Sequence, residues 1–158
     1  MRTKILEMTI GMEDMDRLYG HAGYDAYLRW FKRGHLDLLD GIGIGLEALK
    51  KDCGLGNVVR HAEIDYKAPI SHGDRIVIRT KISGIGSTSV RYSQTIEKGD
   101  LEVSAARMAV VFVDKEGKPA YIPSPVRQKL QGWMGLEYSE ERYDDFGAPF
   151  ENGQPRPL

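Results

Sequence analysis

A helical period of apolar residues begins at Tyr24 and continues to Leu39. Apolar side chains recur there at spacings of three and four residues, which places them on one face of an α-helix. This face consists of Tyr24, Tyr27, Leu28, Phe31, His35 and Leu38, widened by Trp30, Leu36 and Leu39. The polar stripe that remains contains Asp25, Arg29, Lys32, Arg33, Asp37 and Asp40. The pattern predicts a long helix wrapped by other structure on most sides, with Gly41 as its C-terminal stop.

A period of two residues, which is typical of β-strands, covers most of the remaining chain. It predicts strands at residues 2–12, 57–67, 74–82, 88–98 and 101–114. The segment 101–114 is apolar on both faces, so we expect it in the middle of the sheet. Short helices are predicted at 44–52, ended by Gly54, and at 125–131, and residues 13–22 are predicted to form a loop. A single helix inside one curled antiparallel sheet is an α+β architecture.

Length and composition are those of one ordinary domain. The chain has 158 residues, 41% of them hydrophobic, and a net charge of -1, which gives no reason to expect nucleic acid or a membrane as a partner. Its single cysteine, Cys53, cannot form an internal disulfide, which fits a reducing compartment. No apolar run approaches the roughly 20 residues that span a bilayer. We expect a cytoplasmic protein with one domain at 1–131 and a C-terminal extension at 132–158.

Two carboxylates precede the long helix closely. Asp14 and Asp16 are followed by Gly20 and His21, just before the helix begins. The first amides of a helix are unpaired and partly positive, so they can stabilise a carbonyl oxygen that becomes negative. A nearby carboxylate can attack a thioester or activate a water for that attack. The alternative is structural: Asp16 and Asp25 cap the helix, and Asp14 is solvated.

The same segment resembles the 4-hydroxybenzoyl-CoA thioesterase branch of the hotdog-fold proteins. The resemblance covers about residues 5–130 and implies a hotdog fold, acyl-CoA thioester hydrolysis, and a homodimer or dimer of dimers with the cleft at the subunit boundary. The matching pieces are Asp14-Met15-Asp16, Gly20-His21, Tyr27-Leu28-Arg29-Trp30-Phe31, Ile64-Asp65-Tyr66 with Pro69 and Gly73-Asp74, and Val113-Asp114 with Lys118-Pro119 and Ile122-Pro123.

The resemblance also implies roles for individual residues. Asp16 takes the part of the catalytic carboxylate, and the backbone of Gly23, Tyr24 or both polarises the thioester carbonyl. His21 orients Asp16 or holds the substrate, or else it is a loop histidine bonded to the backbone. This chain has three residues between Asp16 and Gly20 where the family usually has two, so Arg17 stands in the catalytic column unless a gap is placed there.

Further residues are candidates for contact with the substrate. CoA carries phosphates, so a basic rim is expected around its site. The main candidates are Arg17, Tyr19, Asp25, His61 and Arg91, and weaker ones on strands are Arg75, Arg79, Lys81 and Arg107. Asp25 stabilises the helix dipole or competes for the same amides. The aromatic residues near the helix, Tyr19, Tyr24 and Trp30, are compatible with aryl or medium-length acyl groups and equally with a place in the core.

Two other functions remain open on this reading. One is a hydratase or dehydratase that acts on an acyl thioester, which would need a His–Asp pair across the cleft. The other is a non-catalytic acyl-CoA binding module. No cofactor is expected beyond the CoA of the substrate, and Asp14, Asp16 and His21 lack the spacing of a metal site.

Overall fold

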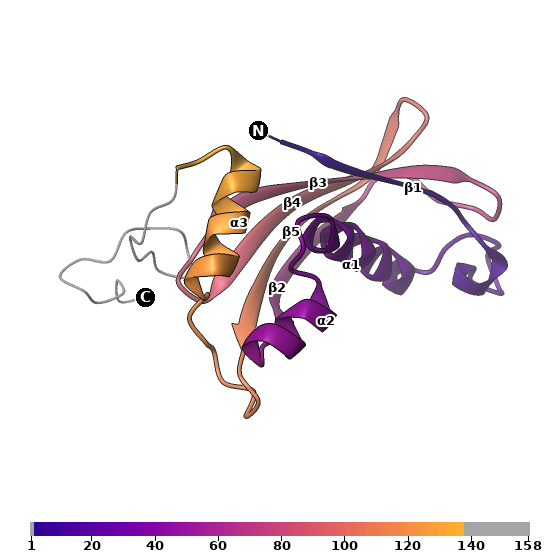
Figure 1. Cartoon of the computed structure of the whole chain (residues 1–158). Coiled ribbons are helices and arrows are strands. Elements are labelled where there is room, and N and C mark those ends of the chain that lie inside the picture. The colour runs from indigo at the N-terminus through magenta and orange to yellow at the C-terminus, as the bar shows by residue number, and fades with distance from the viewer. Residues whose placement is uncertain (1, 138–158) are drawn as a thin grey trace.

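One five-stranded antiparallel sheet curls around the long helix, as the computed structural model of residues 2–137 shows (Figure 1). The strands lie in the order β1-β3-β4-β5-β2. Their bounds are β1 (Lys4–Thr9), β2 (Gly56–Tyr66), β3 (Arg75–Ile85), β4 (Ser89–Lys98) and β5 (Leu101–Val113). The predicted α+β architecture is confirmed.

The strand predictions differ from the structure mainly at their ends. The first strand stops at Thr9 because the Ile10 backbone leaves the sheet to bond with the turn at residues 73–74. Strand β3 runs three residues beyond the predicted end, to Ile85. Strand β5 is internal, between β4 and β2, whereas β4 holds the middle position that the sequence assigned to 101–114. A strand with neighbours on both sides needs apolar residues on both faces whether or not it is the central one.

Helix α1 (Tyr24–Gly41) has 18 residues and lies in the concave face of the sheet. Its buried side is turned slightly from the predicted one. Tyr24 and Leu28 are 79% and 41% exposed, whereas Trp30 is 2% exposed. Gly41 lies inside the helix, and the left-handed residue that follows its end is Gly43, with φ 79°.

A glycine allows α1 to approach the sheet closely. A Cβ added at Gly34 would lie 2.8 Å from atoms of Gln94, Ile78 and Thr80. The Gln94 amide uses this proximity to donate to the carbonyl of Phe31, at 2.7 Å, and to the Thr80 hydroxyl, at 2.9 Å. A buried polar side chain thereby fixes the position of α1 on β3 and β4.

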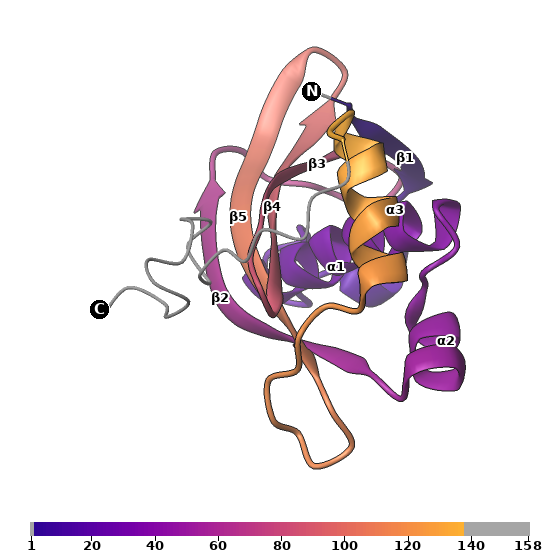
Figure 2. The same ribbon diagram turned by 60° about the vertical axis from the view of Figure 1, so that its left-hand side comes forward.

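The core is divided into two clusters along α1. The first cluster contains Tyr27, Trp30 and Phe31 and packs against the start of the chain. The second contains Leu38 and Leu39 and packs against the other helices. These are α2 (Leu46–Ala48), its π-helical continuation Leu49–Cys53, and α3 (Ser124–Met134). Figure 2 shows α3 on the same side of the sheet as α1.

The short helices agree with their predicted positions, with shifted bounds. Gly54 ends the second helical segment in the left-handed conformation, with φ 66°. Helix α3 extends three residues beyond the predicted end at 131, to Met134. Residues 138–158 of the predicted extension lie outside the described residues, so the division of the chain at 131 stays a prediction.

Candidate active site

The loop before α1 forms a small hairpin that carries Asp16. Met15 and Ala22 form an antiparallel bridge, and the Asp16 amide donates to the His21 carbonyl at 2.7 Å. Gly20 closes the tip in the left-handed conformation, with φ 69°, and its amide donates to the Asp16 carbonyl. The hairpin places Asp16 directly across from His21, and His21 precedes the first residue of the helix by three positions.

One oxygen of Asp16 orients the side chain, and the other is not engaged. Its Oδ1 accepts hydrogen bonds from the amides of Leu18, at 2.8 Å, and Tyr19, at 3.2 Å. Within the described residues, no group donates to Oδ2 of Asp16. The extra residue of this loop therefore lies in a turn that Asp16 itself closes, and the free oxygen remains available for chemistry.

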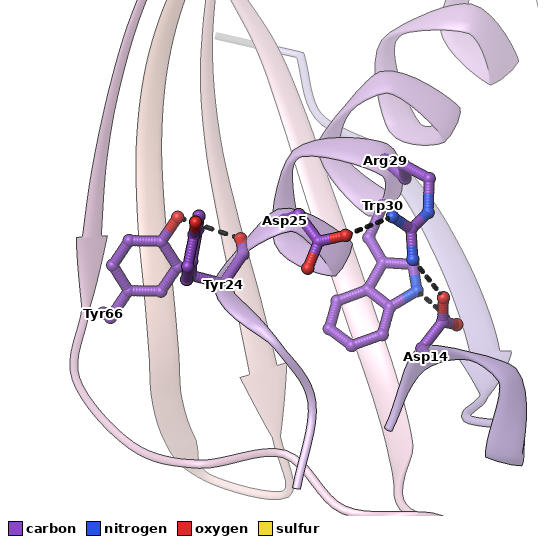
Figure 3. Close-up of polar contacts among 6 residues, drawn as sticks. All are labelled: Asp14, Tyr24, Asp25, Arg29, Trp30 and Tyr66. Carbon is purple, nitrogen blue, oxygen red and sulfur yellow. Dashed lines mark hydrogen bonds and ion pairs between the residues drawn. The ribbon is translucent and has the colours of Figure 1, made fainter. Parts of the chain in front are cut away.

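Asp14 has a different role, because both of its oxygens contact α1 (Figure 3). Its Oδ1 accepts from Arg29 Nη2 at 2.6 Å, and its Oδ2 accepts from the Trp30 indole N–H at 3.3 Å. Arg29 also donates to Asp25 through Nη1, at 3.0 Å. The Asp14 carboxylate, followed by that of Asp25, raises the pKa of Arg29. We call these three charged residues, Asp14, Arg29 and Asp25, the carboxylate bridge.

The first turn of α1 offers one amide that the protein does not use. The Gly23 amide donates to the Asp14 carbonyl at 3.3 Å. Hydrogen bonding from Arg29, and then from the amides of Asp25 and Ala26, lowers the pKa of the Asp25 carboxyl, so Asp25 lies over the helix N-terminus. In the described part of the chain, the Tyr24 amide has no acceptor. Of the two predicted amide donors, Tyr24 is therefore the available one.

An aromatic residue of the sheet, Tyr66, holds the same turn. The Tyr66 hydroxyl of β2 donates to the Tyr24 carbonyl at 3.0 Å (Figure 3). The rings of Tyr66 and Tyr27 meet edge to face, with centroids 4.9 Å apart. Burial, with Tyr24 and Asp25 as further causes, raises the pKa of Tyr66. This hydroxyl therefore stays protonated and continues to donate at neutral pH.

The other predicted loop residues lie around the hairpin tip. Arg17 and Tyr19 are exposed. His21 Nδ1 lies 3.2 Å from the Ala22 carbonyl, and its ring stacks on Tyr19 with centroids 5.8 Å apart. The structure therefore places Asp16, Arg17, Tyr19 and His21 on one hairpin, which precedes Tyr24 at the start of α1.

His61 and Arg91 lie elsewhere, on the outer face of the sheet. Side chains alternate along a strand, so Arg91 points away from the α1 side that its neighbour Tyr92 faces. His61 pairs with Glu63 at 3.1 Å. Together with Arg107, these residues line a hollow of about 450 Å³. The structure does not bring these two candidates to the α1 N-terminus.

Sequence reasoning missed three residues that organise this site. Arg29 and Trp30 hold Asp14, and Tyr66 holds the first turn of α1. The signal for the first two was present, because both belong to the motif Tyr27–Phe31, and Asp25 and Arg29 have the spacing of a helical ion pair. Tyr66 belongs to another matched piece, whose contact with α1 depends on the folded sheet.

Residues 2–137, which the structure describes, contain no cluster of metal ligands and no membrane-spanning helix. No group of three His, Cys, Asp or Glu side chains there is arranged to hold a metal ion. No helix in the same part of the chain has the length and apolar character needed to cross a membrane.

The chain belongs to the thioesterase-like superfamily, whose family model matches residues 10–130. It is 26% identical over 124 residues to the acyl-acyl carrier protein thioesterase ATL2 of Arabidopsis thaliana, a match that covers 77% of this chain and 65% of the plant protein. It is also 27% identical over 117 residues to the acyl-CoA thioesterase YbgC of Haemophilus influenzae, covering 73% and 85% of the two chains. The chain thus spans just under two thirds of the length of the plant relative.

A solved structure agrees with this family assignment. The probable thioesterase from Bartonella henselae superposes with a TM-score of 0.73 at 26% identity, and the match covers 77% of this chain and 100% of the other. The predicted hotdog fold and the predicted family are confirmed.

Proposed function

We propose that this protein hydrolyses an acyl thioester carried on a phosphopantetheine arm, releasing a carboxylic acid and a thiol. The observation that carries the proposal is an oriented carboxylate with one free oxygen, Asp16, on the hairpin that leads into a helix whose Tyr24 amide is free. Membership of the thioesterase-like superfamily supports the same reaction. The relatives named above act on CoA and on carrier-protein thioesters, so both kinds of substrate are proposed.

In the proposed reaction, the Tyr24 amide and the positive end of α1 stabilise the thioester oxygen as it becomes negative. Asp16 acts in one of two ways. As a nucleophile, it bonds to the carbonyl carbon and expels the thiolate, and water then cleaves the mixed anhydride. As a general base, it takes a proton from the attacking water, and the thiolate leaves from the tetrahedral intermediate and is protonated.

The carboxylate bridge is proposed to position this loop. Arg29 joins Asp14 to Asp25, and Trp30 adds a second donor to Asp14. Asp14 thereby fixes the start of the hairpin to α1 while its own oxygens are occupied. A displacement of the reacting group by about 1 Å lowers a rate on the order of a hundredfold, so such a contact has a direct effect on turnover.

The test is hydrolysis of a panel of acyl-CoA esters, followed by detection of the free thiol. Asp16→Asn is expected to lower kcat about a hundredfold or more while the circular dichroism spectrum is retained. Asp52→Asn, an exposed carboxylate on the second helical segment, is the matched control. Full activity of Asp16→Asn would contradict the assignment and move attention to Arg17 or Asp25. Water addition to an enoyl-CoA without release of thiol would replace hydrolysis by hydration.

Self-association is also proposed, with strand β2 as the contact. It is an edge strand of 11 residues, and Val58, Val59 and Tyr66 on it are 51%, 44% and 49% exposed. Long exposed edges of this kind favour pairing with another strand. Light scattering coupled to size exclusion tests this, and a monomer at micromolar concentration would contradict it.

A further inference from the structure

The hollow on the outer face of the sheet lies apart from the candidate active site. Its volume is about 450 Å³, and the described residues that line it all belong to strands β2, β3, β4 and β5. Helices α1 and α3 both lie on the opposite side of the sheet (Figure 2). The polar and charged side chains that matter for the chemistry of the hollow are Arg60, Glu63, Ser83, Ser89, Arg91 and Arg107.

Positive charge dominates this hollow. Three guanidinium groups line it, those of Arg60, Arg91 and Arg107. Glu63 is the one carboxylate among the described lining residues, and it lies 3.1 Å from His61. Arg107 is exposed, and no carboxylate in the described part of the chain pairs with it. Guanidinium groups bind carboxylates through paired N–H groups, so the hollow favours a ligand with several carboxylates.

A buried hydroxyl in the lining also lacks a partner. Ser89 is 1% exposed, and its Oγ has no hydrogen-bond partner among the described residues. Its neighbour Val90 belongs to the core under α1, so Ser89 shares the outer face with Arg91. A buried hydroxyl without a partner destabilises a protein, and an acceptor brought into the hollow removes that cost.

The C-terminal segment of the chain has the complementary composition. Residues 138–158 contain five acidic residues and two arginines, which gives a net charge of -3. Four of the five acidic residues lie within residues 140–146, together with Tyr143 and Phe146. Carboxylates next to aromatic rings suit arginines, because a guanidinium binds a carboxylate and also stacks on a ring face.

Helix α3 brings this segment within reach of the hollow. Arg127 of α3 donates to two carbonyls of the turn between β3 and β4, at 2.8 and 3.4 Å. The same turn leads directly into Ser89 at the start of β4. From Arg127 to Leu136, which caps the end of α3, the helix advances about 14 Å. Eight further residues span about 26 Å when extended, so the chain is long enough for Asp144 to return to the hollow.

We propose that residues 140–146 bind in the outer hollow of their own chain, with the carboxylates of Asp144 and Asp145 on its arginines. An acceptor oxygen of the segment also satisfies the Ser89 hydroxyl. The inference goes beyond the proposed hydrolysis and does not depend on it.

Limited proteolysis of the full chain with chymotrypsin tests the contact, and mass spectrometry identifies each cut. The reference is a free peptide of residues 138–158, whose sites are fully accessible. Cleavage after Phe146 is expected to be about fivefold slower, or more, in the parent protein than in the peptide, because the bound segment must leave the hollow first. Each variant below is compared with a peptide of its own sequence, which removes any effect on the protease itself.

Charge reversal then tests the partners. Arg107→Glu should raise the rate after Phe146 about fivefold, because repulsion replaces an ion pair at an exposed position. Asp144→Lys/Asp145→Lys, added to Arg107→Glu, should return the rate to that of the parent. Lys51→Glu reverses an exposed charge on the second helical segment and is the matched control. Circular dichroism checks that each variant is folded.

A cross-link identifies the chain that supplies the segment. In a Cys53→Ser background, Ala109→Cys in the hollow and Ala148→Cys beside the segment are expected to form a disulfide within one chain under mild oxidation. Lys32→Cys, on the exposed side of α1, replaces Ala109→Cys as the control and should not form it. The proposal is overturned by parent cleavage as fast as that of the peptide, by an Arg107→Glu rate equal to the parent rate, or by a disulfide found only between chains.

Discussion

The buried histidine of α1 is expected to make folding stability depend on pH in a window where few other groups titrate. His35 is 1% exposed, and its ring stacks on Tyr92 of β4 with centroids 4.8 Å apart. Burial, with the Lys32 ammonium as the second cause, lowers the pKa of His35 from 6.5 to about 4. The unfolded chain therefore binds more protons than the folded chain between these two values.

The sign and size of the effect follow from the two pKa values. Stability is fully present above pH 6.5 and is lost as the pH falls toward 4. The whole difference corresponds to about 3 kcal/mol, of which roughly 2 kcal/mol is lost between pH 7 and pH 5. Most carboxylates titrate below this interval, so His35 is expected to dominate the slope.

Urea denaturation followed by circular dichroism at pH 7, 6 and 5, at a fixed protein concentration, measures this slope. His35→Phe keeps an aromatic ring against Tyr92 and is expected to remove the loss, whatever its effect on stability at pH 7. His35→Gln serves if the larger ring packs poorly. His72→Gln replaces an exposed histidine and should retain the slope of the parent. An identical pH slope in His35→Phe and the parent would refute the reasoning.

Two further substitutions test the bridge and the helix contact. Asp14→Asn should lower kcat about tenfold by loosening the link to Arg29, with only a small loss of stability because the Arg29 side chain is 53% exposed. Asp37→Asn changes a carboxylate of α1 that pairs with Lys4, and it should leave kcat unchanged. A kcat of Asp14→Asn equal to that of the parent would contradict the bridge. Gly34→Ala should destabilise the fold by about 1–3 kcal/mol, because three sheet side chains lie 2.8 Å from the added Cβ. Gly132→Ala should not destabilise it, because the space around Gly132 is open. A urea midpoint of Gly34→Ala equal to that of the parent would refute the close approach.

The fold was largely predictable because it depends on periodicity. The alternation of Ile76, Ile78 and Ile82 identified the buried face of β3, and Phe31 and Leu38 identified the buried side of α1. Tyr24 was misassigned to that side. Its spacing fits, but its side chain is 79% exposed at the first position of the helix, and spacing alone carries no information on where the sheet ends.

The candidate site was predictable in its location but not in its detail. The sequence brought a carboxylate pair to a helix N-terminus, and it could not reveal that Asp14 turns toward Arg29 while Asp16 closes a turn. His61 and Arg91 were predicted as substrate-binding residues, but the strand register places both on the outer face of the sheet, and the sequence does not reveal that register. The expected cytoplasmic location stays a prediction.

The division of the core into two clusters has a consequence for how this protein unfolds and diverges. Ala22 of the hairpin belongs to the cluster at the first half of α1, and Val126 and Leu130 of α3 belong to the cluster at the second half. Regions with separate apolar contacts open as separate cooperative units. The amides of α3 should therefore exchange their hydrogens while the amides of the hairpin stay protected. Substitutions that accumulate beneath α3 are then expected to alter the lifetime and abundance of the protein while leaving the hairpin before α1 in place. Lineages built on this plan can therefore remodel one end of the domain without losing their chemistry at the other.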